Sequence, residues 1–386
     1  MTVQTAVEKA LVEAVVVHGR IDLGGRELFD SDAMDAMRLL QRIVPQTISS
    51  SSSSSLLSSS SLTLDCSQNY ICPDGCRAIA QTVSSFSSCN DMTLDLENNL
   101  AGSQGAVYLA DICLSTTTTT TTNKCQSRLL RLRHLRLGSN MIGVQGAMAI
   151  ANALATNHTL TSLDLGVNKI GNLGAQALAQ ALSTNHTLQE LHLERNMIGN
   201  TGFLAIMKAL DTNHGSNLTN LSLARNLIND NGMRGLHHIW NNNDDDKTQG
   251  CLSCLDLGFN LLSGHGLQFL ADAVQSNHQL ESVRVTGPNV AAKNHPAYHR
   301  LRFYLYRNRI QDKIRDMLVD VDDNSKGASV ASQWAFVLSS LLLLQQRKQQ
   351  PGYGLDVAYC LIRNQPSLFQ NLPRTTATTT TTTTRQ

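Results

Sequence analysis

The fold is decided by the stretch SLDLGVNKIGNLGAQALAQALSTNHTLQEL, which runs from Ser162 to Leu191. It contains no cysteine and one histidine, and its other ionisable side chains are those of Asp164, Lys169 and Glu190. Leucine, alanine, glycine and asparagine dominate it, and these residues offer packing and backbone hydrogen bonds rather than chemistry. Because the pattern recurs along most of the chain, it predicts an architecture.

The phrase LxLxxN recurs along the chain, beginning with a degenerate copy at Leu64. The structural anchors of the repeat are the asparagines of this phrase, Asn69, Asn99, Asn140, Asn168, Asn196, Asn226 and Asn260. A last degenerate copy, Val283–Val285 followed by Pro288, comes after them. The shortest spacing between copies is 28 residues. That period lies within the range of about 20–29 residues that is typical of leucine-rich repeats.

A second pattern fixes the register of the repeat. The sixth residue after every anchor is a glycine: Gly75, Gly105, Gly146, Gly174, Gly202, Gly232 and Gly266. In the repeat of Asn168, apolar residues follow at Ala175, Leu178, Ala179 and Leu182. This i, i+3, i+4, i+7 spacing predicts one face of a helix. The pattern therefore predicts that each unit forms a short strand, a loop and a helix.

The residue types have physical reasons. Leu163 and Leu165 alternate with Asp164, so two side chains point inward and one points outward. The anchor asparagine has both a donor and an acceptor for backbone groups of the loop. The glycine suits a position where a Cβ would clash or where φ is positive. One unit alone cannot bury its apolar face, so the units are expected to stack.

Over roughly Leu62–Pro288 the unit LxxLxLxxNxIgxxGAxxLAxAL resembles the ribonuclease-inhibitor type of leucine-rich repeat. Such repeats also occur in NOD-like receptors and in the Ran GTPase-activating protein. The resemblance implies an α/β fold, a curved solenoid with parallel strands on the concave face, helices on the convex face and helical end caps.

The predicted organisation has five parts: an N-terminal helical cap, a serine-rich linker, a solenoid of about eight units, a C-terminal helical cap and a disordered threonine-rich tail. In order, they span residues 1–48, 49–61, 62–290, 291–373 and 374–386. Polar insertions at 116–122 and 241–249 fall where a helix returns to a strand, and they are expected to be surface loops.

Composition narrows the classes of function. A net charge of +1 argues against a broad surface for nucleic acid or an acidic membrane. The longest apolar run, Trp334–Leu344, is too short for a bilayer, which needs about 20 residues. The first apolar stretch carries Glu8 and Glu13 and makes a poor signal peptide. We therefore expect a cytoplasmic or nuclear protein, with no cofactor, no nucleic-acid partner and no membrane partner.

The sequence contains two groups of residues that could bind a metal ion. The nine cysteines include one CxxC pair, Cys251 and Cys254, and a zinc site normally needs four ligands. Histidines at one phase of the repeat, His158, His186, His214 and His278, form a possible metal ladder. Each follows an asparagine in the turn after a helix, where both residue types serve as caps. No metal site is predicted.

The favoured functional surface is the row of strand residues between the two inward apolar positions, which runs from Asp65 through Ser222 to the last strand. With flanking positions, the expected partner-binding residues are Asp95, Arg133, His134, Arg136, Asp164, Glu190, His192, Glu194, Asp256 and Arg284. The row contains no aromatic residue, and Tyr70 and Phe259 beside the anchors are the nearest candidates for binding hot spots. The alternative is that solvent-facing strand positions are simply polar.

Two functions remain open, and a third is disfavoured. The first is a non-catalytic scaffold that binds an unidentified protein on the concave face. The second, raised only by the resemblance, is a regulator of a small GTPase. An innate-sensor fragment is less favoured, because no GK[ST] phosphate-binding loop occurs. No nucleophile–base pair is visible, so no catalytic residue is predicted.

Overall fold

The computed structural model describes residues 20–50, 61–86, 91–114, 132–241, 251–287 and 295–322. The chain divides into two units, Met1–Leu305 and Tyr306–Gln386. The first unit holds the repeats. The described part of the second unit is the C-terminal portion of one helix.

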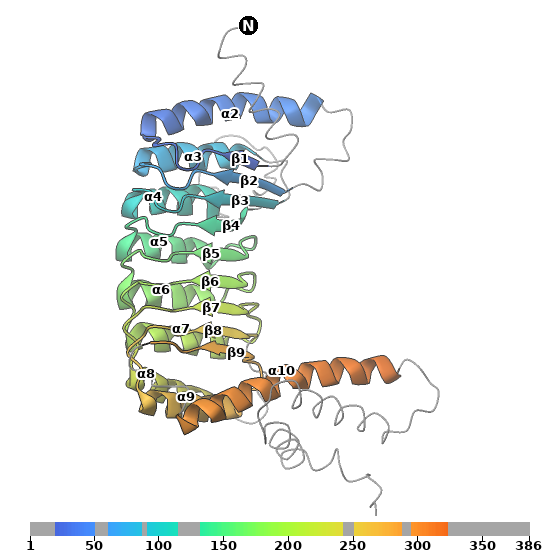
Figure 1. Cartoon of the computed structure of the whole chain (residues 1–386). Helices are drawn as coiled ribbons and strands as arrows, with labels where there is room; N and C mark the ends of the chain where they lie inside the picture. Colours follow the sequence, from blue (N-terminus) through green and yellow to red (C-terminus); the bar gives the residue numbers. More distant parts are fainter. Residues whose placement is uncertain are drawn as a thin grey trace, which may run out of the picture. The chain divides into compact units, whose positions relative to one another are not determined.

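Strands and helices alternate through the first unit (Figure 1). The strands are β1 (Arg20–Asp22), β2 (Ser61–Asp65), β3 (Asp91–Asp95), β4 (Leu132–Arg136), β5 (Ser162–Asp164), β6 (Glu190–His192), β7 (Asn220–Ser222), β8 (Cys254–Asp256) and β9 (Ser282–Arg284). The helices are α2 (Asp30–Ser50), α3 (Pro73–Ser85), α4 (Gly102–Leu109), the π-helix η1 (Ala110–Leu114), α5 (Gly143–Leu154), α6 (Gly171–Leu182), α7 (Asn200–Thr212), α8 (Asp230–Asn241), α9 (Gly264–Ser276) and α10 (Pro296–Asp322).

The strands form one parallel sheet in chain order, β1 to β9. Helices are about 10 Å wide, whereas neighbouring strands lie about 4.8 Å apart. Stacking therefore curves the solenoid, with the strands on the concave side. Between the two layers, Leu163, Leu165, Ala175 and Leu178 are fully buried, and every repeat contributes the same column of aliphatic side chains. The predicted α/β solenoid is confirmed.

Buried asparagines connect one turn of the solenoid to the next. The Asn168 side chain accepts hydrogen bonds from the backbone N–H groups of Asn140 (2.9 Å) and Ile142 (3.2 Å). Its amide donates to the carbonyl oxygens of Leu137 (2.8 Å) and Gly166 (3.0 Å). The same bonding continues through Asn196. Each anchor thus satisfies backbone groups of the loop before its own, and we call this file of side chains the asparagine ladder.

The residue before every anchor has a left-handed backbone conformation. These residues are Gln68, Asn98, Ser139, Val167, Arg195, Arg225 and Phe259, with φ between 52° and 57°. Left-handed conformations are uncommon outside glycine and are least favourable for a β-branched residue such as Val167. The seven side chains share no chemistry, so the surrounding hydrogen bonds impose the conformation.

The glycines six residues after the anchors are required by close packing, because none has a positive φ. A Cβ at Gly202 would lie 2.9 Å from both the Ala175 Cβ and the Ile198 Cγ2. Of the two reasons given for this glycine in the sequence, the structure shows the steric one. Small residues let each helix approach its predecessor.

A second file of asparagines lies where each helix returns to a strand. The Asn185 amide donates to the carbonyl oxygens of Leu154 (2.8 Å) and Asn157 (2.9 Å). The Asn213 amide donates in the same way to Leu182 (2.7 Å) and Asn185 (2.9 Å). The histidines that follow these asparagines are exposed. The asparagine is therefore the capping residue of each Asn-His pair.

The sheet begins one unit earlier than expected. Arg20–Asp22, within the predicted helical cap, pairs with β2 as the strand β1. This unit has Arg26 where later units have an asparagine, and the Asn69 side chain accepts from the N–H groups of Arg26 (3.1 Å) and Leu28 (3.0 Å). The arginine at the anchor position breaks the LxLxxN pattern, although the strand and the residues after it, IDLG at 21–24, match the LDLG of residues 163–166.

The ends of the solenoid are described in part. α2 runs to Ser50, into the expected linker. α10 corresponds to the first of the three predicted C-terminal helices, and its Arg300 pairs with Asp272 of α9 at 2.6 Å. Other predicted features lie outside the described residues: the two later C-terminal helices, the threonine-rich tail and insertion 116–122, and all of insertion 241–249 except Asn241.

Removing one member of the asparagine ladder should strongly destabilise the protein. Asn168→Ala leaves the N–H groups of Asn140 and Ile142 buried without an acceptor. We expect the free energy of unfolding to fall by roughly 2–4 kcal/mol, measured by urea denaturation. Asn152→Ala, at an exposed position of α5, should change it by less than about 0.5 kcal/mol. Equal effects of the two substitutions would contradict the proposed role of the ladder.

Adding one methyl group between neighbouring helices should also destabilise the protein. Gly202→Ala places a Cβ against Ala175 and Ile198, so we expect a loss of about 1–3 kcal/mol in thermal or urea unfolding. Lys208→Ala, at an exposed position of the same helix, serves as the control. A neutral result for Gly202→Ala would show that the helices can separate without cost.

Candidate functional site

Strand pairing places the predicted row in line on the concave face. Directly paired positions run Asp22, Asp65, Asp95, Arg136, Asp164, His192, Ser222, Asp256 and Arg284. A second line, two residues earlier in each strand, holds Arg20, His134 and Glu190. The sheet therefore presents the candidate residues together on one surface, which we call the concave row.

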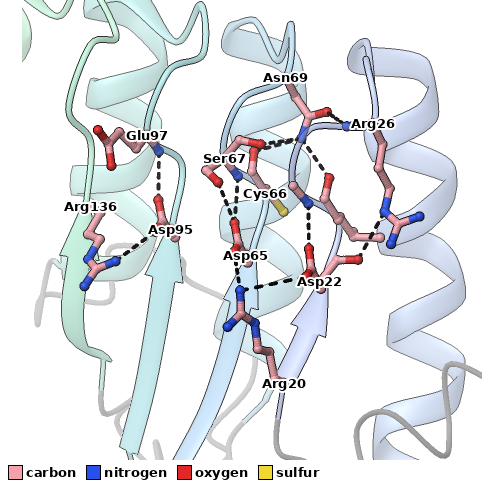
Figure 2. Close-up of polar contacts among 12 residues, drawn as sticks. Arg20, Asp22, Arg26, Asp65, Cys66, Ser67, Asn69, Asp95, Glu97 and Arg136 are labelled. Atoms are coloured by element: carbon pink, nitrogen blue, oxygen red, sulfur yellow. Dashed lines mark hydrogen bonds and ion pairs between the residues drawn. The ribbon is translucent and has the colours of Figure 1, made fainter.

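The aspartates of the concave row have a local structural role. The Asp164 carboxylate accepts a hydrogen bond from the N–H of Gly166 at 2.8 Å. The same bond, to the residue two positions later, is made by Asp22, Asp65, Asp95 and Asp256. Figure 2 shows the first three of these aspartates. Each carboxylate orders the turn after its strand, and the second oxygens of Asp65, Asp95 and Asp256 pair with arginines of neighbouring strands.

Ion pairs join neighbouring strands along the row. Arg136 contacts Asp95 at 3.2 Å (Figure 2), and Arg284 contacts Asp256 at 3.0 Å. Beside the row, Arg133 contacts Asp91 at 3.0 Å. Exposed pairs of this kind add at most about 1 kcal/mol each to stability. Their effect is to orient side chains on the concave face.

Near the centre of the face, carboxylates lie close to one another around Asp164, beside Arg136 and His192. His192 lies 3.4 Å from Glu194, and this hydrogen bond raises the pKa of the imidazole against the opposing effect of burial. Burial would raise the pKa of Glu194, but hydrogen bonds from His192 and Ser222 outweigh it and lower that pKa. Burial, followed by the charge of neighbouring carboxylates, raises the pKa of Glu97. The net pKa of Asp164 is also raised, chiefly by burial.

The remaining predicted residues lie on the same face. The Glu190 carboxylate accepts hydrogen bonds from the Ser162 hydroxyl (3.1 Å) and the Asn220 amide (3.3 Å). His134 is exposed on β4. Sequence reasoning missed Glu97, which holds the same phase as Glu194. Comparing flanking positions between repeats would have found it.

Two residues of β1 on this face, Arg20 and Asp22, were also missed. Arg20 contacts Asp65 at 2.9 Å (Figure 2). The anchor asparagine is missing from this unit, but its sequence IDLG at residues 21–24 matches the LDLG of residues 163–166, and this match could have revealed both residues.

The cysteines of the described core are buried and protonated. Burial raises the pKa of the Cys76 and Cys113 thiols to about 12 and raises that of Cys66 as well. A protonated thiol is neither a nucleophile nor a metal ligand. In the described parts of the chain, no group of three histidine, cysteine or acidic side chains has the geometry to hold a metal ion.

Comparison with known proteins identifies the repeats. A family model described as "Leucine Rich repeat" matches residues 132–151, 156–179 and 184–207. No curated protein matches the chain.

The solved structures that are similar to this chain include the following three. "Leiomodin-1 Actin-Binding Site 2 (ABS2)" has 19% identity and a TM-score of 0.31, covering 47% of this chain and 82% of that one. The tropomodulin C-terminal domain of Caenorhabditis elegans has 14% identity and a TM-score of 0.29, with 46% and 86% covered. The TLR13–ssRNA13 complex has 13% identity and a TM-score of 0.21, with 63% and 52% covered. Likenesses at this level carry no argument about function.

The fold and the matched repeats define the class of protein. The chain carries leucine-rich repeats, and its first unit is a leucine-rich-repeat solenoid. Leucine-rich repeats are generally a non-catalytic interaction fold, and such solenoids use an extended concave surface for binding. Across the described residues, no helix is both long enough and apolar enough to cross a bilayer.

The His192–Glu194 pair makes a testable prediction. By NMR, the His192 imidazole should titrate above its ordinary pKa of 6.5, and Glu194→Gln should lower that pKa. Because folding raises the pKa, the contribution of His192 to stability is complete below pH 6.5 and is lost as the pH rises through the raised value. An unchanged His192 titration in Glu194→Gln would show that the two side chains do not interact.

Proposed function

We propose that this protein is a non-catalytic scaffold of the ribonuclease-inhibitor repeat type that binds a protein partner on its concave strand face. The observation that supports this is the concave row, in which paired strands hold side chains in line from Asp22 to Arg284. A rigid row with one variable residue per repeat suits recognition of a protein surface. The cross-strand ion pairs order part of this surface before binding, which lowers the entropic cost of association.

The charges of the face indicate the chemistry of the partner. Arg136 and His192 are each paired with a carboxylate. Glu97, Asp164 and Glu190, by contrast, form no ion pair within the described residues. The pKa values of Glu97 and Asp164 are raised by burial and, secondarily, by nearby carboxylates. A lysine or arginine from a partner would offset that repulsion, so the face favours a basic segment.

Neutralising the three carboxylates should weaken binding while keeping the fold. We expect Glu97→Gln, Asp164→Asn and Glu190→Gln together to reduce partner binding by roughly tenfold or more. The asparagine at 164 retains an acceptor for the Gly166 N–H. Affinity capture from the native cell followed by quantitative mass spectrometry, with the wild type and the triple variant side by side, measures the effect.

The matched control adds the same positive charge to the helix face. Asn152, Gln176 and Gln180 are exposed on α5 and α6, and replacing each with lysine changes the charge by the same amount. This control should retain the partner that the carboxylate variant loses. Identical capture profiles for all three proteins would refute binding through the concave face. Thermal melts establish that each variant is folded.

A further inference from the structure

Exposed apolar side chains gather along one edge of the solenoid, outside the concave row. The loops after strands β1 to β7 contribute one each, and the loop after β8 contributes two. In the first four described loops these are Phe29, Tyr70, Leu100 and Met141. In the next four loops they are Val167, Met197, Leu227 and the pair Phe259 and Leu261. We call this line of side chains the loop ridge.

The loop ridge holds most of the large apolar groups exposed on the described residues. Nine of the eleven such side chains belong to it, each between 40% and 59% exposed. The two others are Met148 and Leu173, on helices α5 and α6. Scattered exposed apolar residues are ordinary, but a contiguous file of them marks an interaction surface.

Backbone contacts make the loop ridge continuous. The Leu227 N–H donates to the Ile198 carbonyl at 2.8 Å, directly after Met197. The Leu261 N–H donates to the Ile228 carbonyl in the same way, also at 2.8 Å. At the N-terminal end, the rings of Phe29 and Tyr70 stack with centroids 5.2 Å apart. Neighbouring loops therefore present their apolar side chains next to one another.

In the loops from Asn69 to Asn260 the charges beside the anchors have a single sign, whereas the loop of Phe29 carries both Arg26 and Glu27. Within the three residues centred on each anchor, the charged side chains are those of Lys169, Arg195 and Arg225, from three consecutive loops. All three are exposed, and none forms an ion pair within the described residues. Arg225 lies over the Phe259 ring at 4.5 Å. The ridge is thus apolar and basic, whereas the concave row beside it is acidic.

We infer that the loop ridge is a second docking surface, whose occupant is an amphipathic helix of a partner protein with an aliphatic stripe flanked by glutamate or aspartate. The pitch of a helix, about 5.4 Å, is close to the strand spacing of about 4.8 Å. A helix lying along the ridge therefore offers one apolar side chain per turn to each loop. Its acidic flank meets Lys169, Arg195 and Arg225.

The limited exposure of the ridge side chains argues against a membrane as the occupant. Insertion places apolar side chains about 5–10 Å into the boundary between headgroups and acyl chains. About half of each ridge side chain is instead covered by its own protein, and the three cations occupy only the central loops. A shallow apolar strip with a local basic patch fits a protein helix better than a bilayer.

A synthetic peptide tests this inference directly. The probe is a fluorescein-labelled helix of about six turns with leucine at i, i+3, i+4 and i+7 and glutamate on both flanks, and fluorescence anisotropy reports its Kd. Met197→Asn with Leu227→Asn should weaken binding by about tenfold or more; asparagine also tolerates the left-handed φ of Met197. Arg195→Glu with Arg225→Glu should shift preference to the same peptide carrying lysine flanks.

The controls separate this surface from others. Met148→Gln with Leu173→Gln removes the exposed apolar side chains outside the ridge and should leave the Kd unchanged. The variant with neutralised concave carboxylates should bind the peptide like the wild type, so this test stands apart from the proposed function. Absence of peptide binding, equal losses in both apolar variants, or binding to phosphatidylserine vesicles in place of the peptide would overturn the inference. So would a dimer that Met197→Asn with Leu227→Asn dissociates.

Discussion

The whole solenoid depends on satisfying the backbone of the loops that leave the sheet. These loops are buried between neighbouring turns, where water does not reach their N–H and C=O groups. In the loops from Arg26 to Asn226 the side-chain amide of the next repeat's asparagine supplies both the acceptor and the donors, as Asn168 does for the loop of Asn140. Aliphatic packing then follows, because the loops hold each strand and helix at one fixed spacing.

The sequence was sufficient to predict the repeated architecture. The period of the repeat, the anchor asparagine and the glycine six residues after it all indicate that each unit stacks on the next. The strand row followed from the register, since alternate residues of a strand point to opposite faces. The strand Arg20–Asp22 was not predicted because Arg26 stands at the anchor position and breaks the LxLxxN pattern. The aspartate turns depend on contacts two residues apart, which polarity patterns alone do not reveal, whereas Glu97 shares its repeat position with Glu194 and could have been found.

The two candidate surfaces differ in how the fold produces them. Residues of the concave row also have a structural role, because their aspartates accept hydrogen bonds from N–H groups of the turns that follow. The apolar side chains of the loop ridge take no part in the hydrogen bonds that build the loops, so their apolar character has no structural explanation in this fold. Opposite charges on adjacent surfaces would let one partner engage both only if it were itself divided into basic and acidic parts.

The left-handed residue before each anchor has a consequence for how this protein can change. The seven positions carry glutamine, asparagine, serine, valine, two arginines and phenylalanine, so the scaffold imposes the geometry and leaves the chemistry of the side chain open. These positions form a strip on the surface, and a substitution in one turn can change the binding specificity of that turn alone. The architecture thereby uncouples its specificity from its own folding.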